Sequence, residues 1–99
     1  MTSKIPVAIL GATGTVGQKL VRLLEHHPWF EVQVVTASAA SAGRRYGEVV
    51  RWREPTVLPD RVAALTVLDS LTPAPVPLAF SALDTQAAVE LEPLWASAG

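Results

Sequence analysis

The sequence predicts an α/β fold built on a doubly wound parallel sheet, with about four strands and helices on both faces. Short apolar runs alternate with helical patterns along the whole chain, and a glycine-rich turn joins the first run to the first helix. Strands that alternate with crossover helices form parallel sheets. The expected fold is therefore Rossmann-like, and it is truncated, because another parallel strand should follow the last helix.

The first expected strand is the apolar run at residues 5–10, which fits a buried parallel strand. A helix is predicted from Val16 to His27, because apolar residues recur there at helical spacing and Pro28 prevents its continuation. Its expected contact face consists of Val16, Leu20, Leu23, Leu24 and His27. The two elements are joined by the turn Gly11-Ala12-Thr13-Gly14-Thr15-Val16-Gly17.

This turn is the main candidate for a ligand site. Glycine permits positive φ angles and close backbone approach, so Gly11 closes the strand, Gly14 admits a ligand and Gly17 lets the helix lie against the sheet. Unpaired amides at residues 13–16 and the helix dipole favour an anion, and Thr13 adds a hydroxyl donor, as does Thr15. Glycine-rich turns also serve as plain corners. The order of strand, turn and helix indicates the diphosphate of a dinucleotide.

The second expected strand, at residues 31–36, completes a βαβ unit. In NAD-preferring proteins an acidic residue ends this strand and binds the adenine ribose, but here Ala37 and Ser38 stand in that place. With Ser41, Arg44 and Arg45 nearby and no carboxylate to repel a 2′-phosphate, the segment indicates NADP. The alternative is that the arginines form a solvated charge pair and the serines are ordinary turn residues.

The remainder of the chain supplies a connection and two further strands. Residues 43–60 are expected to be irregular, with at most a short helix, and residues 65–68 are a weak strand candidate. Residues 77–80 form the fourth expected strand, which leads into Ser81, Ala82 and Leu83. If this strand flanks the first one on the side away from the second, ligands bind at the switch point between them.

In that arrangement Ser81, Ala82 and Leu83 face the glycine turn, where they could contact the ribose and nicotinamide end of the cofactor. The alternative is that Ser81 simply ends a strand. The final helix is expected at residues 85–98, with Ala88, Leu91, Leu94 and Trp95 on one face. Asp84 or Thr85 is the candidate N-cap, and Pro93 is expected to bend or split this helix.

Composition narrows the possible functions. The 99 residues are 49% hydrophobic and 17% charged with a net charge of −1, which favours neither nucleic acid nor an anionic membrane as a partner. We expect a cytoplasmic protein, since the chain has no run of 18 apolar residues and no leader pattern. The absence of cysteine excludes a thiolate metal site and a cysteine nucleophile within this segment. His26 and His27 lack partners at metal-ligand spacing, so no metal is expected.

In combination, these motifs resemble aspartate-semialdehyde dehydrogenase, in particular its archaeal and fungal branch. The resemblance runs almost end to end and rests on the following segments: residues 7–19, 27–31, 37–38, 41–46, 80–83, 90–93 and 96–99. Asp84-Thr85 departs from it, because the family commonly has Pro-Ser there. Residues 54–76 resemble nothing in particular.

The resemblance implies NADP-dependent, phosphate-requiring reductive chemistry between aspartyl phosphate and aspartate semialdehyde, on the route to lysine, threonine and methionine. It also implies that residues 13–16 (Thr13, Gly14, Thr15 and Val16) bind the phosphates. Ser38 and Ser41 would meet the 2′-phosphate, and Ser81 and Leu83 would lie near the nicotinamide ribose.

Such enzymes use a cysteine thiolate as nucleophile and a histidine as acid and base, and both lie beyond the matched region. We therefore expect residues 1–99 to be an incomplete N-terminal NADP-binding domain that has no turnover alone, belonging to an enzyme that is a homo-oligomer when complete. One alternative is N-acetyl-γ-glutamyl-phosphate reductase, which uses a similar glycine turn. Another is a non-catalytic NADP-binding or sensing module.

Overall fold

The computed structural model describes residues 4–71, 76–83 and 85–98, and for residues 85–87, 90, 97 and 98 it describes only the backbone. The described elements, in chain order, are β1 (Ile5–Leu10), α1 (Thr15–Leu24), β2 (Phe30–Ala37), α2 (Tyr46–Val49), α3 (Asp60–Ala63), β3 (Leu68–Asp69), β4 (Leu78–Ser81) and α4 (Thr85–Ala98). No helix in these ranges is both long enough and apolar enough to cross a membrane.

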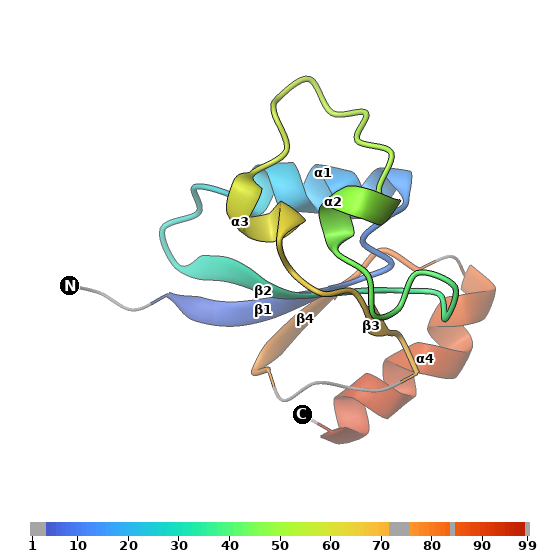
Figure 1. The fold of residues 1–99 in the computed structure, drawn as a ribbon. Helices are drawn as coiled ribbons and strands as arrows, with labels where there is room; N and C mark the ends of the chain where they lie inside the picture. The colour runs from blue at the N-terminus through green and yellow to red at the C-terminus, as the bar shows by residue number, and fades with distance from the viewer. Residues whose placement is uncertain (1–3, 72–75, 84, 99) are drawn as a thin grey trace.

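The four strands form one parallel sheet in the order β3-β2-β1-β4 (Figure 1). Strand β1 has the predicted bounds and lies between β2 and β4, so the chain changes direction across the sheet after β3. This is the predicted strand order. It places a topological switch point at the carboxyl ends of β1 and β4.

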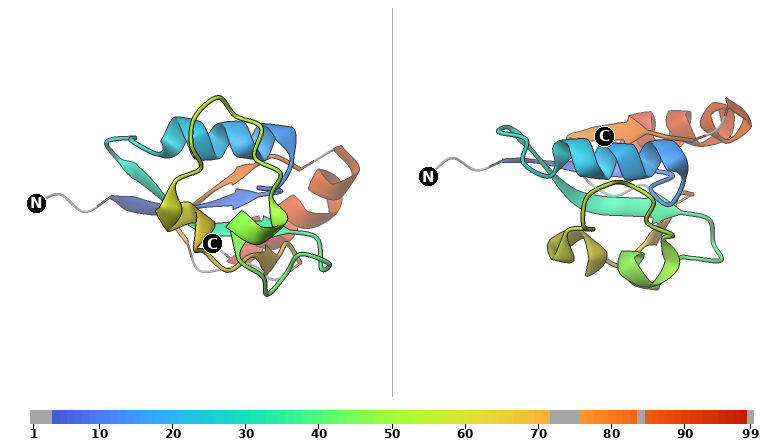
Figure 2. Two further views of the ribbon diagram at one scale, coloured as in Figure 1. Left: turned by 45° about the horizontal axis from the view of Figure 1, so that its top comes forward. Right: turned by 90° about the horizontal axis from the view of Figure 1, so that it is seen from above.

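Helices cover both faces of the sheet, as predicted for a doubly wound fold. Figures 1 and 2 show α1, α2 and α3 on one face and α4 on the other. Side chains of β1 alternate accordingly: Val7 and Ile9 belong to the core under the first three helices, whereas Ala8 and Leu10 pack with Trp95 of α4. The period of two along a strand explains why neighbouring residues serve different helices.

The predicted contact face of α1 is wrong at two positions. Val16 and Leu23 are 57% and 62% exposed, whereas the buried residues of the helix are Gly17, Gln18, Val21 and Leu24. The helix is rotated because Gly17 must face the turn from which it emerges, and a stripe that begins at residue 17 leaves residues 16 and 23 outside.

Helix α1 also ends at Leu24, three residues before the predicted end. His27 lies in the turn that follows, where its Nδ1 accepts hydrogen bonds from the amides of Trp29 at 3.0 Å and Phe30 at 3.2 Å. The imidazole therefore shapes the entry into β2 and does not extend the helix.

The connection predicted at residues 43–60 contains the short helix α2. A second short helix, α3, begins at Asp60, the last residue of that connection. The strand predicted at residues 65–68 is displaced, because only Leu68 belongs to β3. Val67 exchanges backbone hydrogen bonds of 2.8 Å with Gly43 and Arg44. Its backbone is thus committed to the 43–45 segment, and pairing with β2 starts one residue later.

Helix α4 runs from Thr85 to Ala98 without interruption, so Pro93 does not split it. Trp95 is buried, but Leu94 is 44% exposed, so the predicted contact face is wrong at that residue. Successive helical residues point about 100° apart, so when Trp95 packs against Ala8 and Leu10 of the sheet, Leu94 points away from them. The predicted N-cap lies outside the described residues, because Asp84 and the Thr85 side chain are not described.

Candidate functional site

A crevice of about 540 Å³ lies at the carboxyl ends of the strands, beside the switch point. Its wall consists of Gly11, Thr13, Gly14, Ala37, Ser38, Ala39, Asp69, Ser70, Leu71, Ala82, Leu83 and Leu91. These residues come from the ends of β1, β2, β3 and β4 and from α4. Open α/β sheets bind their ligands in crevices at this place, so this is the leading candidate site.

The backbone of the glycine turn brings these walls together. Gly11 has a φ of +73°, and a Cβ there would lie 3.2 Å from the Ala82 carbonyl oxygen and from Leu83 Cδ2. A side chain at Gly17 would collide with the Gly11 carbonyl and would lie 2.7 Å from Ala12 Cα. Glycine is therefore required at residue 11 for the crossing to residues 82–83, and at residue 17 for the close approach of α1.

The turn presents backbone N–H groups at the start of α1. The amide of Gly14 bonds to the Gly11 carbonyl at 3.3 Å, so it is not unpaired as the sequence predicted. Among the described residues, the amides of Thr13, Thr15 and Val16 have no acceptor. Three free donors at the positive end of a helix dipole can receive an anion such as a diphosphate.

Two buried side chains that the sequence did not reveal as functional hold this turn in shape. The Tyr46 hydroxyl donates to the Ala12 carbonyl at 2.6 Å, and burial raises the pKa of this phenol above its ordinary value, so it stays a donor. Gln18 Nε2 donates to the Thr13 carbonyl at 3.0 Å, and its Oε1 accepts the Arg53 amide at 2.8 Å. The only available signal was Gln18, a polar residue among the apolar positions of α1.

Hydroxyl groups connect the strand ends at the wall of the crevice. Thr36 Oγ1 accepts the Gly11 amide at 3.3 Å and lies 2.7 Å from Ser70 Oγ, which donates to the Ala37 carbonyl at 3.2 Å. Trp95 Nε1 donates to the Ser70 carbonyl at 2.8 Å. This network links β1, β2 and α4 through Ser70, and it fixes their relative positions because its groups are buried and paired.

The residues that the sequence assigned to a 2′-phosphate divide into two groups. Ser38 follows β2 directly, is exposed and lines the crevice. Ser41 and Arg44 lie in the turns beyond it and are not part of the crevice wall. The Arg44 guanidinium lies 3.7 Å from the Glu48 carboxylate, with both side chains more than half exposed. The carboxylate in the crevice wall is that of Asp69, whose Oδ1 accepts the Leu71 amide at 2.9 Å.

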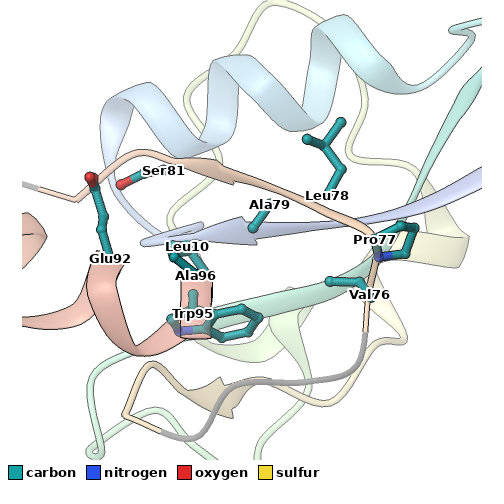
Figure 3. Close-up of a pocket in the computed structure, with 9 residues that line it drawn as sticks. All are labelled: Leu10, Val76, Pro77, Leu78, Ala79, Ser81, Glu92, Trp95 and Ala96. Carbon is teal, nitrogen blue, oxygen red and sulfur yellow. The ribbon is translucent and has the colours of Figure 1, made fainter. Parts of the chain in front are cut away.

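Residues 81–83 do not all line the same hollow. Ala82 and Leu83 line the crevice, opposite Gly11, as predicted. Ser81 instead lines a separate hollow of about 300 Å³ between β4 and α4. Figure 3 shows Trp95 of α4 beside Leu10 of β1 in this hollow, with Ser81 at one end. Within the described ranges, no cluster of histidine and carboxylate side chains could hold a metal ion.

Comparison with known proteins gives consistent matches. The family model described as semialdehyde dehydrogenase, NAD binding domain, matches residues 6–99. Aspartate-semialdehyde dehydrogenase from Cryptococcus neoformans is 42% identical over 93 residues, which cover 90% of this chain and 26% of that protein. The enzyme of the same name from Archaeoglobus fulgidus is 41% identical over 95 residues, covering 94% of this chain and 27% of that protein.

The fold has a solved counterpart. The crystal structure of aspartate semialdehyde dehydrogenase with NADP from Candida albicans superimposes with a TM-score of 0.89 at 32% identity, covering 97% of this chain and 28% of that one. These findings confirm the predicted fold class and the family resemblance. The chain spans about a quarter of the length of the relatives that it matches.

Proposed function

This chain belongs to the semialdehyde dehydrogenase family, as its NAD-binding domain, and from that membership we propose that it is the dinucleotide-binding part of an NADP-dependent aspartate-semialdehyde dehydrogenase. In the proposed reaction, aspartyl phosphate is reduced to aspartate semialdehyde with release of phosphate. The product leads to lysine, threonine and methionine. The observation that carries the proposal is the crevice at the switch point, whose glycine turn offers free amides to a diphosphate.

The glycine turn beside the crevice fits a dinucleotide in two respects. Within the described part of the chain nothing accepts the amides of Thr13, Thr15 and Val16, so they can donate to phosphate oxygens. At Gly14, a Cβ would meet only the Gly11 carbonyl, at 3.7 Å, so the backbone there is open to a ligand. Bound nicotinamide supplies the hydride, and this chain supplies the contacts that hold and orient the cofactor.

The end of β2 favours NADP over NAD. Residues 37 and 38 carry no carboxylate, and the Ser38 hydroxyl can donate to a 2′-phosphate. Asp69, whose carboxylate lines the same crevice, already accepts the Leu71 amide through Oδ1. We propose that Ser41 and Arg44 approach the same phosphate from the adjoining turn, which requires Arg44 to leave its exposed pair with Glu48. Exposed pairs are weak, at about 0.2–1 kcal/mol, so the exchange is inexpensive.

We propose that Ala82 and Leu83 contact the ribose of the nicotinamide half, because they face Gly11 across the crevice. Ser81 would contribute through its hydroxyl, which accepts the Leu83 amide at 3.5 Å and so orients the chain after β4. The covalent step requires a thiolate, and the chain contains no cysteine. We therefore propose that the catalytic residues belong to a further part of a longer enzyme, and that these 99 residues alone have no turnover.

The proposal is tested by calorimetric titration of this chain with NADPH and NADH. A charge-assisted hydrogen bond contributes roughly 1.5–3 kcal/mol, so NADPH should bind roughly tenfold to a hundredfold more tightly. Ser38→Ala should reduce this preference and leave NADH affinity unchanged. Equal affinities for the two cofactors would remove the assignment of NADP. Absence of binding to either one would contradict the proposed function itself.

A further inference from the structure

A second, more polar hollow of about 260 Å³ lies on the other side of the glycine turn, against α1. It is lined by Thr13, Gly14, Thr15, Gln18, Val49, Arg51 and Arg53. Thr13 and Gly14 therefore belong to the walls of both the crevice and this hollow. Thr15, the first residue of α1, lines only the second one.

The hollow carries two positive charges that no carboxylate of the described residues pairs with. Arg51 and Arg53 are both exposed, and in the part of the chain that the structure describes neither forms an ion pair. The adjacent acid, Glu54, is held by Arg22 at 2.7 Å, and its side chain is only 8% exposed. The carboxylate of Glu48 faces Arg44 instead.

Arg53 is held beside the turn by its own backbone. The Arg53 amide donates to Gln18 Oε1, and Gln18 Nε2 bonds to the Thr13 carbonyl, so one buried side chain ties residue 53 to the turn. The ion pair between Arg22 and Glu54 fastens the next residue to the same helix. The backbone position of Arg53 is thus set by contacts that do not use its guanidinium group, and Arg51 lies two residues before it on the same segment.

We propose that Arg51 and Arg53 bind the diphosphate of the dinucleotide, from the side of the glycine turn that faces away from the crevice. The inference rests on the proposed function and extends it to two residues outside the crevice. Thr13, whose amide is free among the described residues, lines both hollows, and Thr15 lines the second one, so a phosphate held at these two amides would lie beside Arg51 and Arg53. Guanidinium groups suit this ligand, since their planar donors match phosphate oxygens and their charge is permanent.

The test compares R51Q, R53Q and the double variant with the wild-type chain, using calorimetric titration with NADPH and with adenosine 2′-monophosphate, which lacks the diphosphate. We expect NADPH affinity to fall about tenfold in the double variant and its salt dependence to weaken, because two phosphate contacts are lost. Affinity for adenosine 2′-monophosphate should not change. The matched control is K4Q, an exposed lysine at the opposite end of β1, which should bind NADPH as the wild type does.

The outcomes separate the two proposals. Wild-type affinity for NADPH in the double variant would overturn this inference while leaving the proposed function intact, whereas a wild-type chain that fails to bind NADPH would overturn both. An equal loss of adenosine 2′-monophosphate binding would assign the arginines to the 2′-phosphate and refute the diphosphate contact. A further titration adds inorganic phosphate to the NADPH-saturated protein, to test whether the arginines bind a free phosphate and not the diphosphate of the cofactor. If inorganic phosphate binds and R51Q/R53Q abolishes that binding, the diphosphate contact is also refuted.

Discussion

Replacement of Gly17 by alanine tests the close approach of α1 to the glycine turn. The new Cβ would lie 2.7 Å from Ala12 Cα and 2.9 Å from the Ala12 carbonyl carbon, and both are backbone atoms that cannot rotate away. Ordinary contacts begin at 3.4 Å, so a movement of about 0.7 Å is needed to clear Ala12 Cα alone, and the Gly11 carbonyl oxygen, which lies closer still, requires more. Overpacking of this kind costs about 1–3 kcal/mol, against a gain in helix propensity of about 1 kcal/mol.

Because the clashes are with backbone atoms, we take the cost of overpacking at the upper end of this range, and the net expectation is a loss of about 1–2 kcal/mol in the free energy of unfolding. Urea denaturation followed by tryptophan fluorescence measures it, since Trp95 is buried and should report unfolding. With a urea m-value of about 2 kcal/mol per molar, the middle of the range for a small domain, the midpoint should fall by roughly 0.5–1 M. The sign of the change is diagnostic, because alanine in an open helix position would stabilise the protein.

Gly14→Ala is the matched control. A Cβ at Gly14 would meet only the Gly11 carbonyl, at 3.7 Å, so no backbone shift is required. Its stability cost should be limited to the N-cap preference of glycine over alanine, roughly 0.5 kcal/mol. If Gly17→Ala unfolds at the same urea concentration as the wild type, or at a higher one, the described packing of α1 on the turn is incorrect.

Three further predictions follow from the same geometry. Gly14→Ala, although folded, should lower NADPH affinity at least tenfold in calorimetry, because its methyl group enters the crevice wall; unchanged affinity would argue against a ligand there. Tyr46→Phe should lower the free energy of unfolding by about 1–2 kcal/mol in urea, since the Ala12 carbonyl loses its buried donor. Burial raises the pKa of Tyr46 in the folded state, so wild-type stability should decline as pH rises above about 10, the ordinary tyrosine value, and Tyr46→Phe should lack that part of the decline.

The sequence was sufficient to predict the strand, turn and helix around the glycine motif, because those elements follow from local patterns. The bounds of β1 and the placement of β4 beside it were predicted from apolar runs and from the rules of parallel sheets. The face of α1 was not, because Gly17 contributes no hydrophobicity to a helical pattern and yet decides which side meets the sheet. Val16 and Leu23 fit the helical spacing of apolar residues, but in the structure both are exposed.

The supports of the site could not be predicted from the sequence, since they are contacts between distant residues. Tyr46 is 34 positions from Ala12, and Arg53 is 35 positions from Gln18. Nothing in a single sequence pairs these positions. The strand predicted at residues 65–68 failed for a related reason: the 43–45 segment competes for the backbone of Val67, and that competition depends on tertiary packing.

The most direct test of the central claim is a two-dimensional amide NMR titration of this chain with NADPH. If the crevice at the switch point binds the dinucleotide, the largest chemical-shift changes should occur at amides of the glycine turn and of the crevice wall. These are the amides of Thr13, Thr15 and Val16 in the turn, and of Ser38 and Leu83 in the wall. Shifts confined to residues of the hollow between β4 and α4, such as Ala79 and Ala96, with the glycine turn unaffected, would contradict the account.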